Sequence, residues 1–285
     1  MKRNYLFEIL AFTIIRVLSA MVILVLLAIL VFIIVRGASV ISWEFLTEMP
    51  QEGMTKGGIL PAIIGTLSLV AVSIVWAFPV GVMSAIFMNE YMQQGWYKRL
   101  IRMMTNNLAG IPSIVFGLFG MSLFVNDLKF GDSILAGSLT LGILTLPVII
   151  RTTEEALVSV DQTFREASLA LGATRLQTIT KVILPSAIPN ILTGLILSVG
   201  RVSGETAPIL FTVAAYFLPK LPSSLFDQVM ALPYHLYVIT TSGTNIEESR
   251  PMAYGTALVL LIIVLSVNGL AYSVKYYYQK STSKN

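Results

Sequence analysis

Residues 166–185 read EASLALGATRLQTITKVILP, a polar, helix-compatible stretch in the second half of an otherwise apolar chain. Gly172 interrupts its helical pattern, which is typical of a helix C-terminus whose backbone needs a positive φ. We therefore expect two short amphipathic helices, over 153–170 and 174–184, with Gly172 setting the angle between them.

The composition of the whole chain predicts an integral membrane protein. Of its 285 residues, 55% are hydrophobic and 12% are charged, and it has no cysteine. A soluble domain carries roughly a quarter charged residues. The composition therefore excludes a disordered chain, a disulfide-stabilised domain and an ordinary soluble enzyme. The net charge of +4 would suit a nucleic-acid partner, but orientation in a lipid bilayer explains it better, so we expect no nucleic-acid binding.

Long stretches without charge mark the expected membrane spans, because a helix needs about 20 apolar residues to cross the hydrocarbon core. Six such stretches occur, at 17–35, 57–89, 103–126, 133–150, 182–219 and 251–274, and only the fifth is interrupted, by Arg201 and Glu205. The two longest have room for additional re-entrant or interfacial segments, and we place their helices near 59–88 and 188–215. The expected fold is an all-α membrane protein with six transmembrane helices.

The distribution of Lys and Arg predicts the orientation, since cytoplasmic loops carry an excess of both. One face would hold Lys2, Arg3, Arg16, Lys98, Arg99, Arg102, Arg151, Arg165, Arg175, Lys181, Lys275, Lys280 and Lys284. The other would hold only Arg36, Lys56, Lys129, Lys220 and Arg250. Both termini should therefore be cytoplasmic.

We expect a single transmembrane domain over residues 1–285. An N-terminal helix over about 14–36 is interpreted as a retained anchor, because its apolar core is long for a secretory signal. The core of the domain should cover about 57–275 and include the polar loop 151–187.

The spacing within that polar loop matches a known pattern. The loop resembles the EAA loop of ATP-binding-cassette (ABC) importer permeases, whose pattern is E-A-A-x3-G-x9-I-x-L-P. The matching positions are 166–168, Gly172 and 182–185. Ser168 replaces the second alanine and Val182 replaces the isoleucine. In that family the loop forms a short coupling helix that sits in a groove of the cytoplasmic ATPase.

The resemblance implies that coupling to the ATPase is carried by Glu166, Ala167, Ser168, Ala170 and Gly172. Small side chains let another chain approach closely, and Glu166 can pair with a basic residue of the partner. The alternative is an amphipathic helix on the lipid surface. Such a helix should be rich in Lys and Arg, whereas 153–170 has one arginine, Arg165, and four carboxylates. We therefore favour docking to a protein.

Five other stretches narrow the resemblance to the PstA-type permeases of phosphate ABC importers. They are GGILPAIIGTLSLV (57–70), NLAGIPSIVFGLFG (107–120), TLPVIIRTTEEAL (145–157), GRVSGETAPILFT (200–212) and LPYHLY (232–237). The resemblance implies a type I ABC importer permease bundle in the bacterial cytoplasmic (inner) membrane. It also implies four partners: a second permease subunit of the PstC type, a cytoplasmic ATPase dimer, an extracytoplasmic phosphate-binding protein and phosphate itself.

Arg201 and Glu205 are the only charges inside the expected spans. Each costs about 2.5–3.5 kcal/mol at mid-membrane on insertion scales. Their i, i+4 spacing would let them neutralise each other on one helix face. One interpretation is a salt bridge that serves packing, and the other is a substrate pathway, because a guanidinium matches the oxygens of phosphate. We favour the pathway, and in the family that the chain resembles such membrane-embedded charges are implicated in phosphate passage.

The chain carries no G-x4-G-K-[ST] phosphate-binding loop, so we expect a separate subunit to hydrolyse ATP. We expect no catalytic residues, cofactor or metal, because a single histidine, His235, cannot form a metal site alone. A permease for phosphonate, sulfate or molybdate stays open, since arginine recognises all these oxyanions. A secondary transporter with Glu205 as proton carrier is a less favoured alternative, because the inverted repeats expected there are not evident.

Overall fold

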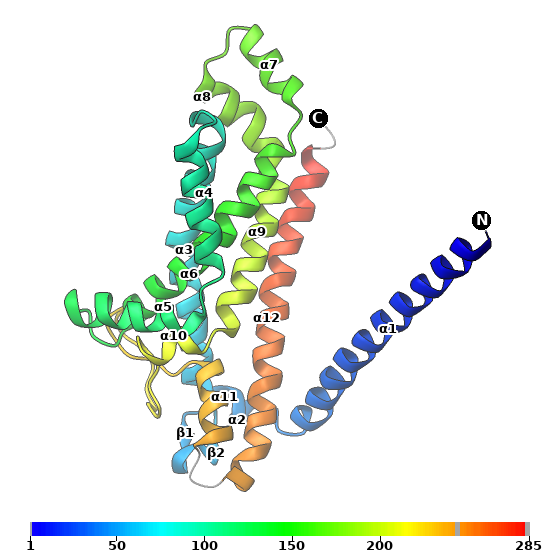
Figure 1. The fold of residues 1–285 in the computed structure, drawn as a ribbon. Helices are drawn as coiled ribbons and strands as arrows, with labels where there is room; N and C mark the ends of the chain where they lie inside the picture. The colour runs from blue at the N-terminus through cyan, green and yellow to red at the C-terminus, as the bar shows by residue number, and fades with distance from the viewer. Residues whose placement is uncertain (1, 243–245, 283–285) are drawn as a thin grey trace.

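The computed structural model describes residues 2–242 and 246–282 and is mainly helical (Figure 1). In chain order the elements are α1 (Lys2–Ala38), α2 (Trp43–Thr47), β1 (Pro50–Gln51), η1 (Glu52–Met54), β2 (Lys56–Gly57), α3 (Leu60–Ile86), η2 (Phe87–Tyr91), α4 (Trp96–Ala109), α5 (Ser113–Gly120), η3 (Met121–Asp127), α6 (Ile134–Val158), α7 (Gln162–Ala170), α8 (Arg175–Thr178), η4 (Ile179–Ile183), α9 (Leu184–Gly204), α10 (Ala207–Leu210), α11 (Leu232–Thr241) and α12 (Ile246–Thr282). The short strands β1 and β2 pair antiparallel. The helices, rather than this hairpin, determine the architecture.

In the described part of the chain, five helical segments are long and apolar enough to cross a membrane. They are Glu8–Ala38, Leu60–Tyr91, Ile134–Val158, Arg175–Gly204 and Ser249–Tyr278. A sixth crossing arises if Trp96–Ala109 and Ser113–Asp127, which meet at 99°, count as one broken span. With the bent pair counted as one, the prediction of six spans is confirmed.

The expected span over 103–126 is not one continuous helix. Helix α4 ends at Ala109, and the chain turns sharply through residues 110–112 before α5 begins at Ser113. Gly110 and Pro112 flank the turn, and a residue that precedes proline is disfavoured in the helical region. The bend therefore has a local cause in the sequence.

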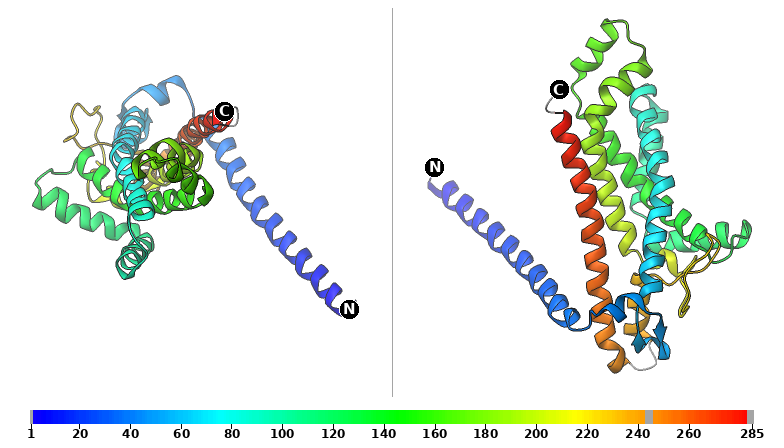
Figure 2. Two further views of the ribbon diagram at one scale, coloured as in Figure 1. Left: turned by 90° about the horizontal axis from the view of Figure 1, so that it is seen from above. Right: turned by 180° about the vertical axis from the view of Figure 1, so that it is seen from behind.

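Helices α3, α6 and α9 form the centre of the bundle, and α12 packs along α9 (Figures 1 and 2). Small residues allow these close approaches, as is common between membrane helices. A Cβ on Gly142 of α6 would collide with the indole ring of Trp76 on α3. The same indole donates a hydrogen bond from Nε1 to the carbonyl oxygen of Ser138, at 3.2 Å.

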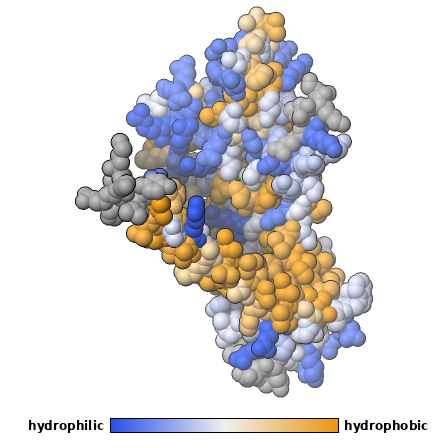
Figure 3. All heavy atoms as spheres, turned by 90° about the vertical axis from the view of Figure 1, so that its right-hand side faces the viewer, coloured by the Kyte–Doolittle hydropathy of each residue, from blue (hydrophilic) through white to orange (hydrophobic). Residues whose placement is uncertain are grey.

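Helix α1 stands apart from the bundle and contacts α12 near its own C-terminal end (Figure 2). Its apolar side chains are largely exposed, and none of the residues in its most apolar window is buried. Figure 3 shows apolar side chains in a zone below the middle of the molecule and more hydrophilic ones around much of its upper end and at its lower tip. An exposed apolar helix of this length is suited to contact with lipid.

The two ends of the bundle differ. One end holds α7, α8 and the C-terminal end of α12, and we name it the α7 end (Figure 1). The N-terminal end of α1 lies toward this end of the molecule. At the opposite end, the α11 end, lie α2, the β-hairpin and α11. The stretch between α10 and α12 is not a single loop, because α11 covers Leu232–Thr241 and α12 begins at Ile246.

Two further helix boundaries differ from those expected. A helix over 153–170 is wrong, because α6 continues to Val158 and α7 begins a new helix at Gln162. The side chain of Asp161 accepts a hydrogen bond from the backbone N–H of Thr163, which caps the new helix. The expected helix over 174–184 does not end there, because α8, η4 and α9 run on as one span, with Pro185 in the first turn of α9.

Candidate functional site

Arg201 and Glu205 form an ion pair where α9 ends. Arg201 Nε lies 3.3 Å from Glu205 Oε1. The expected helix over 188–215 is wrong: α9 ends at Gly204, and Glu205 adopts an extended backbone with φ −74° and ψ 126°. The two residues therefore pair across a helix end rather than along one helix face. This end exposes backbone groups at the same place as the two charges.

The pair lies near the middle of the bundle. Gly200, the neighbour of Arg201, faces Asn268 of α12, whose Nδ2 is 3.3 Å from where a Cβ on Gly200 would lie. Asn268 is well inside the span Ser249–Tyr278. Its Oδ1 is buried and has no hydrogen-bond partner in the structure. A polar side chain of α12 therefore lies against the residue next to Arg201.

The pair is reachable from one side. The side chain of Arg201 is 35% exposed and that of Glu205 is 17% exposed. No atom lies within 4 Å of where a Cβ on Gly204 would be. A guanidinium in the last turn of a membrane span, one-third exposed in this subunit, faces either lipid, which is costly, or a polar space beside a partner.

Three threonines that could offer hydroxyl donors to an anion are instead used within their own helices. Thr66, Thr140 and Thr145 donate to the carbonyl oxygens of Ala62, Ala136 and Leu141, at 2.8, 2.8 and 3.1 Å. Thr66 Oγ1 also accepts a hydrogen bond from the backbone N–H of Leu232, at 2.8 Å. These hydroxyls serve the packing of the bundle, as is usual for membrane helices.

The polar loop forms a helical hairpin at the α7 end. Gly172 has φ +83°, which confirms the positive φ expected at this glycine. Thr174 and Gln177 form a capping box that starts α8. Backbone hydrogen bonds from Gly172 and Ala173 to Leu169 and Ser168 end α7, and the capping box starts α8, so both ends of the turn are fixed.

Four of the five residues expected to dock, Glu166, Ala167, Ala170 and Gly172, lie exposed on this hairpin. Ser168 is half-buried, and its hydroxyl lies 2.9 Å from that of Thr178 on α8. It therefore ties α7 to α8 and has little surface to offer a partner.

The tip of the hairpin is apolar as well as exposed. Leu171 is 89% exposed, and Leu169 and Leu176 are also exposed. Helix α7 has no buried residue. Exposed apolar groups in a polar region of a surface mark a contact with another molecule.

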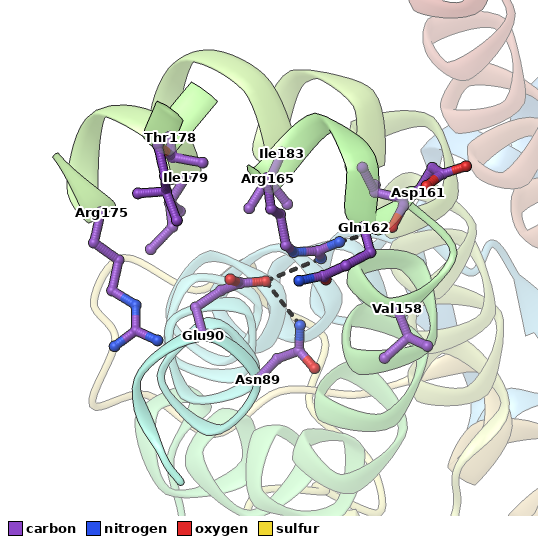
Figure 4. Close-up of a pocket in the computed structure, with 12 residues that line it drawn as sticks. Asn89, Glu90, Val158, Asp161, Gln162, Arg165, Arg175, Thr178, Ile179 and Ile183 are labelled. Carbon is purple, nitrogen blue, oxygen red and sulfur yellow. Dashed lines mark hydrogen bonds and ion pairs between the residues drawn. The ribbon is translucent and has the colours of Figure 1, made fainter. Parts of the chain in front are cut away.

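One buried ion pair was missed by the sequence analysis. Arg165 of α7 lies 3.1 Å from Glu90 at the end of α3, between the Nη2 and Oε1 atoms (Figure 4). Their side chains are 12% and 9% exposed. Seventy-five positions separate them in sequence, and neither spacing nor composition links such distant charges.

His235 is buried in α11, and neither of its ring nitrogens has a hydrogen-bond partner in the structure. Burial lowers the pKa of this imidazole to about 4, so the ring is neutral at physiological pH. Across the described residues, no group of three or more His, Cys, Asp or Glu side chains is placed to hold a metal ion.

Comparison with known proteins gives consistent matches. A family model described as "Binding-protein-dependent transport system inner membrane component" matches residues 77–284. The chain is 36% identical over 262 residues to the probable ABC transporter permease protein YqgI of Bacillus subtilis, covering 88% of each chain. It is 40% identical over 222 residues to the phosphate transport system permease protein PstA of Mycobacterium leprae, covering 77% of this chain and 70% of the relative. It is 34% identical over 255 residues to the probable PstA protein of Methanocaldococcus jannaschii, covering 89% and 88%.

Solved structures share the fold. The methionine ABC transporter MetNI in an inward-facing form matches with a TM-score of 0.58 at 18% identity, covering 78% of this chain and 94% of the solved one. A bacterial ABC transporter that imports alginate matches with a TM-score of 0.59 at 14% identity, covering 80% of both chains. At these identities the likeness supports the type I ABC importer permease fold and nothing finer.

Proposed function

Because the chain belongs to the family of binding-protein-dependent transport system inner membrane components, we propose that it is a permease subunit of an ATP-driven phosphate importer. The family is a transport component and not an enzyme family, and it works with an ATPase and a solute-binding protein. Phosphate is proposed as the substrate because several relatives over most of the chain are named phosphate permeases. The observation that carries the proposal is the Arg201–Glu205 pair at the end of α9, which is open on one side.

The chemistry of the pair suits a phosphate pathway. Phosphate at neutral pH carries one or two negative charges, and the guanidinium of Arg201 presents a planar fork of donors that matches its oxygens. Glu205 neutralises Arg201 when no anion is bound. When an anion is bound, the negative charge of Glu205 weakens its binding to Arg201. A transport site must bind weakly enough to release its ion.

We propose that the α7 end faces the cytoplasm. It carries most of the Lys and Arg residues of the loops, which favours the cytoplasmic side. Both termini would then be cytoplasmic, and the α11 end would face the binding protein. A second permease subunit of the PstC type would cover the open side of Arg201 and complete the pathway.

The proposed mechanism is alternating access. ATP binding closes the ATPase dimer and moves the docked hairpin of α7 and α8, so the bundle opens toward the α11 end. The docked binding protein then releases phosphate toward Arg201. Hydrolysis of ATP returns the bundle to the inward-facing form.

The substrate is tested by competition in proteoliposomes that hold the whole complex. Uptake of radiolabelled phosphate should require ATP and the binding protein. When the labelled phosphate is at a saturating concentration, a tenfold excess of unlabelled phosphate should reduce its uptake about tenfold, as simple dilution of the label requires. Sulfate, molybdate or methylphosphonate in the same excess should reduce it less than twofold. Stronger competition by one of these anions would transfer the assignment to that oxyanion. Uptake that persists without ATP but needs a proton gradient would favour a secondary transporter.

Docking of the hairpin to the ATPase is tested by cross-linking. The chain has no cysteine, so Ala170→Cys introduces a single exposed thiol on α7. We expect a cross-link to a cysteine in the ATPase groove, with a yield that changes with nucleotide. The matched control is Gly95→Cys, in the exposed turn between η2 and α4 with no side chain within 4 Å. Equal yields at both positions, or none at Ala170 under any nucleotide condition, would remove the docking assignment.

A further inference from the structure

The end of α3 departs from regular helical geometry where it meets the hairpin. Residues Phe87–Tyr91 form a π-helical turn, η2, at the end of the span that begins at Leu60. Such turns occur often at functional positions because they displace side chains from the regular register. Here the turn carries Glu90, which is buried, and Tyr91.

Arg165 joins three elements through one guanidinium group. Nη2 donates to Glu90 Oε1 of η2 at 3.1 Å and to the carbonyl oxygen of Leu157 at 2.6 Å. Nη1 donates to the carbonyl oxygen of Val160 at 2.7 Å. Leu157 lies in the last turn of α6, where helix geometry leaves carbonyl groups without an N–H partner. Val160 lies in the linker between α6 and α7. Arg165 itself belongs to α7, so the group links α7 to the ends of α3 and α6 (Figure 4).

A second contact attaches the other half of the hairpin to the same turn. The guanidinium carbon of Arg175, in α8, lies 5.6 Å from the centroid of the Tyr91 ring. The hydroxyl contact between Ser168 and Thr178 joins α7 to α8. The two helices of the hairpin therefore contact consecutive residues of η2: Arg165 of α7 contacts Glu90, and Arg175 of α8 contacts Tyr91.

Helix α7 packs mainly on α8 and η4. None of its residues is fully buried, and a hollow of about 420 Å³ borders the pair between Arg165 and Glu90. A force applied to α7 can pass through α8 and η4 into α9, but it reaches the ends of α3 and α6 through the few side chains that span this gap. The planar fork of arginine is suited to that task, because it can satisfy three acceptors at fixed angles.

We propose that Arg165 is a positioning residue that transmits movement of the α7–α8 hairpin to the membrane spans α3 and α6, with Glu90 as its partner. The inference rests on the proposed function, since it needs an ATPase that moves the hairpin. It assigns the transmission to a buried group behind the docking surface rather than to the surface itself.

The test uses the complete complex, purified and reconstituted, with three variants: Arg165→Gln, Glu90→Gln and Arg99→Gln. Arg99 is an exposed arginine in α4, so its variant makes the same chemical change outside the junction. Three quantities are measured per assembled complex: basal ATP hydrolysis, its stimulation by phosphate-loaded binding protein, and phosphate uptake.

For Arg165→Gln we expect basal hydrolysis within about twofold of wild type, and stimulation and uptake reduced about tenfold or more, because a buried charged group has lost its partner. Glu90→Gln keeps the carbonyl contacts of Arg165, so its stimulation should fall by a smaller factor, about threefold. Arg99→Gln should behave as wild type. A purely structural role would lower all three quantities together, with the amount of complex.

Wild-type stimulation and uptake in the Arg165→Gln complex would overturn the inference. If that complex does not assemble, Glu90→Gln decides: a wild-type ratio of stimulated to basal hydrolysis would overturn the inference, and a reduced ratio supports it. A wild-type complex that phosphate-loaded binding protein does not stimulate would instead contradict the proposed function, so the two failures are distinguishable.

Discussion

Arg201→Ala should abolish most phosphate uptake while leaving the complex assembled. Losing a hydrogen bond between a charged donor and the anion costs about 1.5–3 kcal/mol, which corresponds to roughly 10- to 150-fold in rate. The side chain is one-third exposed in this subunit, so its removal should disturb packing little. Initial uptake rates in proteoliposomes, divided by the amount of assembled complex, measure the effect.

Two companion variants separate a pathway from a packing role. Arg201→Lys keeps the charge but loses the planar fork, so a pathway predicts a substantial loss of uptake, whereas a simple ion pair with Glu205 would tolerate it. Glu205→Gln leaves Arg201 without its counter-charge, so the anion should be held more tightly and released more slowly, which lowers both the half-saturating concentration and the maximal rate. Arg36→Ala, at an exposed arginine of α1, is the control and should transport normally. Wild-type uptake in Arg201→Ala would leave only the packing interpretation.

The sequence predicts the membrane crossings well because the physics of each is local. A helix that crosses hydrocarbon must avoid charge over about 20 residues, and this requirement is visible as gaps between charges. Gly172 was predicted for a similar reason, since a helix end with positive φ favours glycine at that one position.

The errors in the sequence analysis fall at helix ends. The bend at 110–112 had a signal in Gly110 and Pro112, but the surrounding apolar run concealed it. The break between α6 and α7 depends on the cap at Asp161, and a helical pattern continues across it. Glu205 was placed on a helix, whereas the structure has it in an extended backbone, yet its pair with Arg201 forms because both residues flank the same helix end.

Contacts between distant segments were beyond the sequence analysis. The pair formed by Glu90 and Arg165 joins two helix ends that only the fold brings together. The buried position of His235 likewise depends on how α11 packs, because an isolated His in a loop sequence is equally compatible with exposure. Long-range pairing is a property of the tertiary structure, and a single sequence contains no local record of it.

Gly65→Val should destabilise the α11 end more than any exposed substitution. A Cβ on Gly65 of α3 would collide with the backbone carbonyl oxygen of Met230 and lie 2.9 Å from Cβ of Val229. A backbone atom cannot rotate away as a long side chain can, so the segment that leads into α11 must shift. The adjacent hydrogen bond from the N–H of Leu232 to Thr66 Oγ1 would then be lost as well.

The expected cost is about 1–3 kcal/mol for overpacking, with a further ~1 kcal/mol for the hydrogen bond. For a chain of this size that corresponds to a melting temperature lower by roughly 4–12 °C. Thermal unfolding of the purified complex in detergent, at one scan rate, measures this change in melting temperature. Gly95→Val is the control, because no atom lies within 4 Å of its Cβ position and its backbone is extended, with φ −174°. A melting temperature for Gly65→Val equal to that of Gly95→Val would show that the segment before α11 is not packed against α3 as described.

The same substitution should also lower phosphate uptake. Thr66, Ala231 and Glu205 line the same small hollow, so a displaced segment before α11 would disturb the charge pair in the bundle.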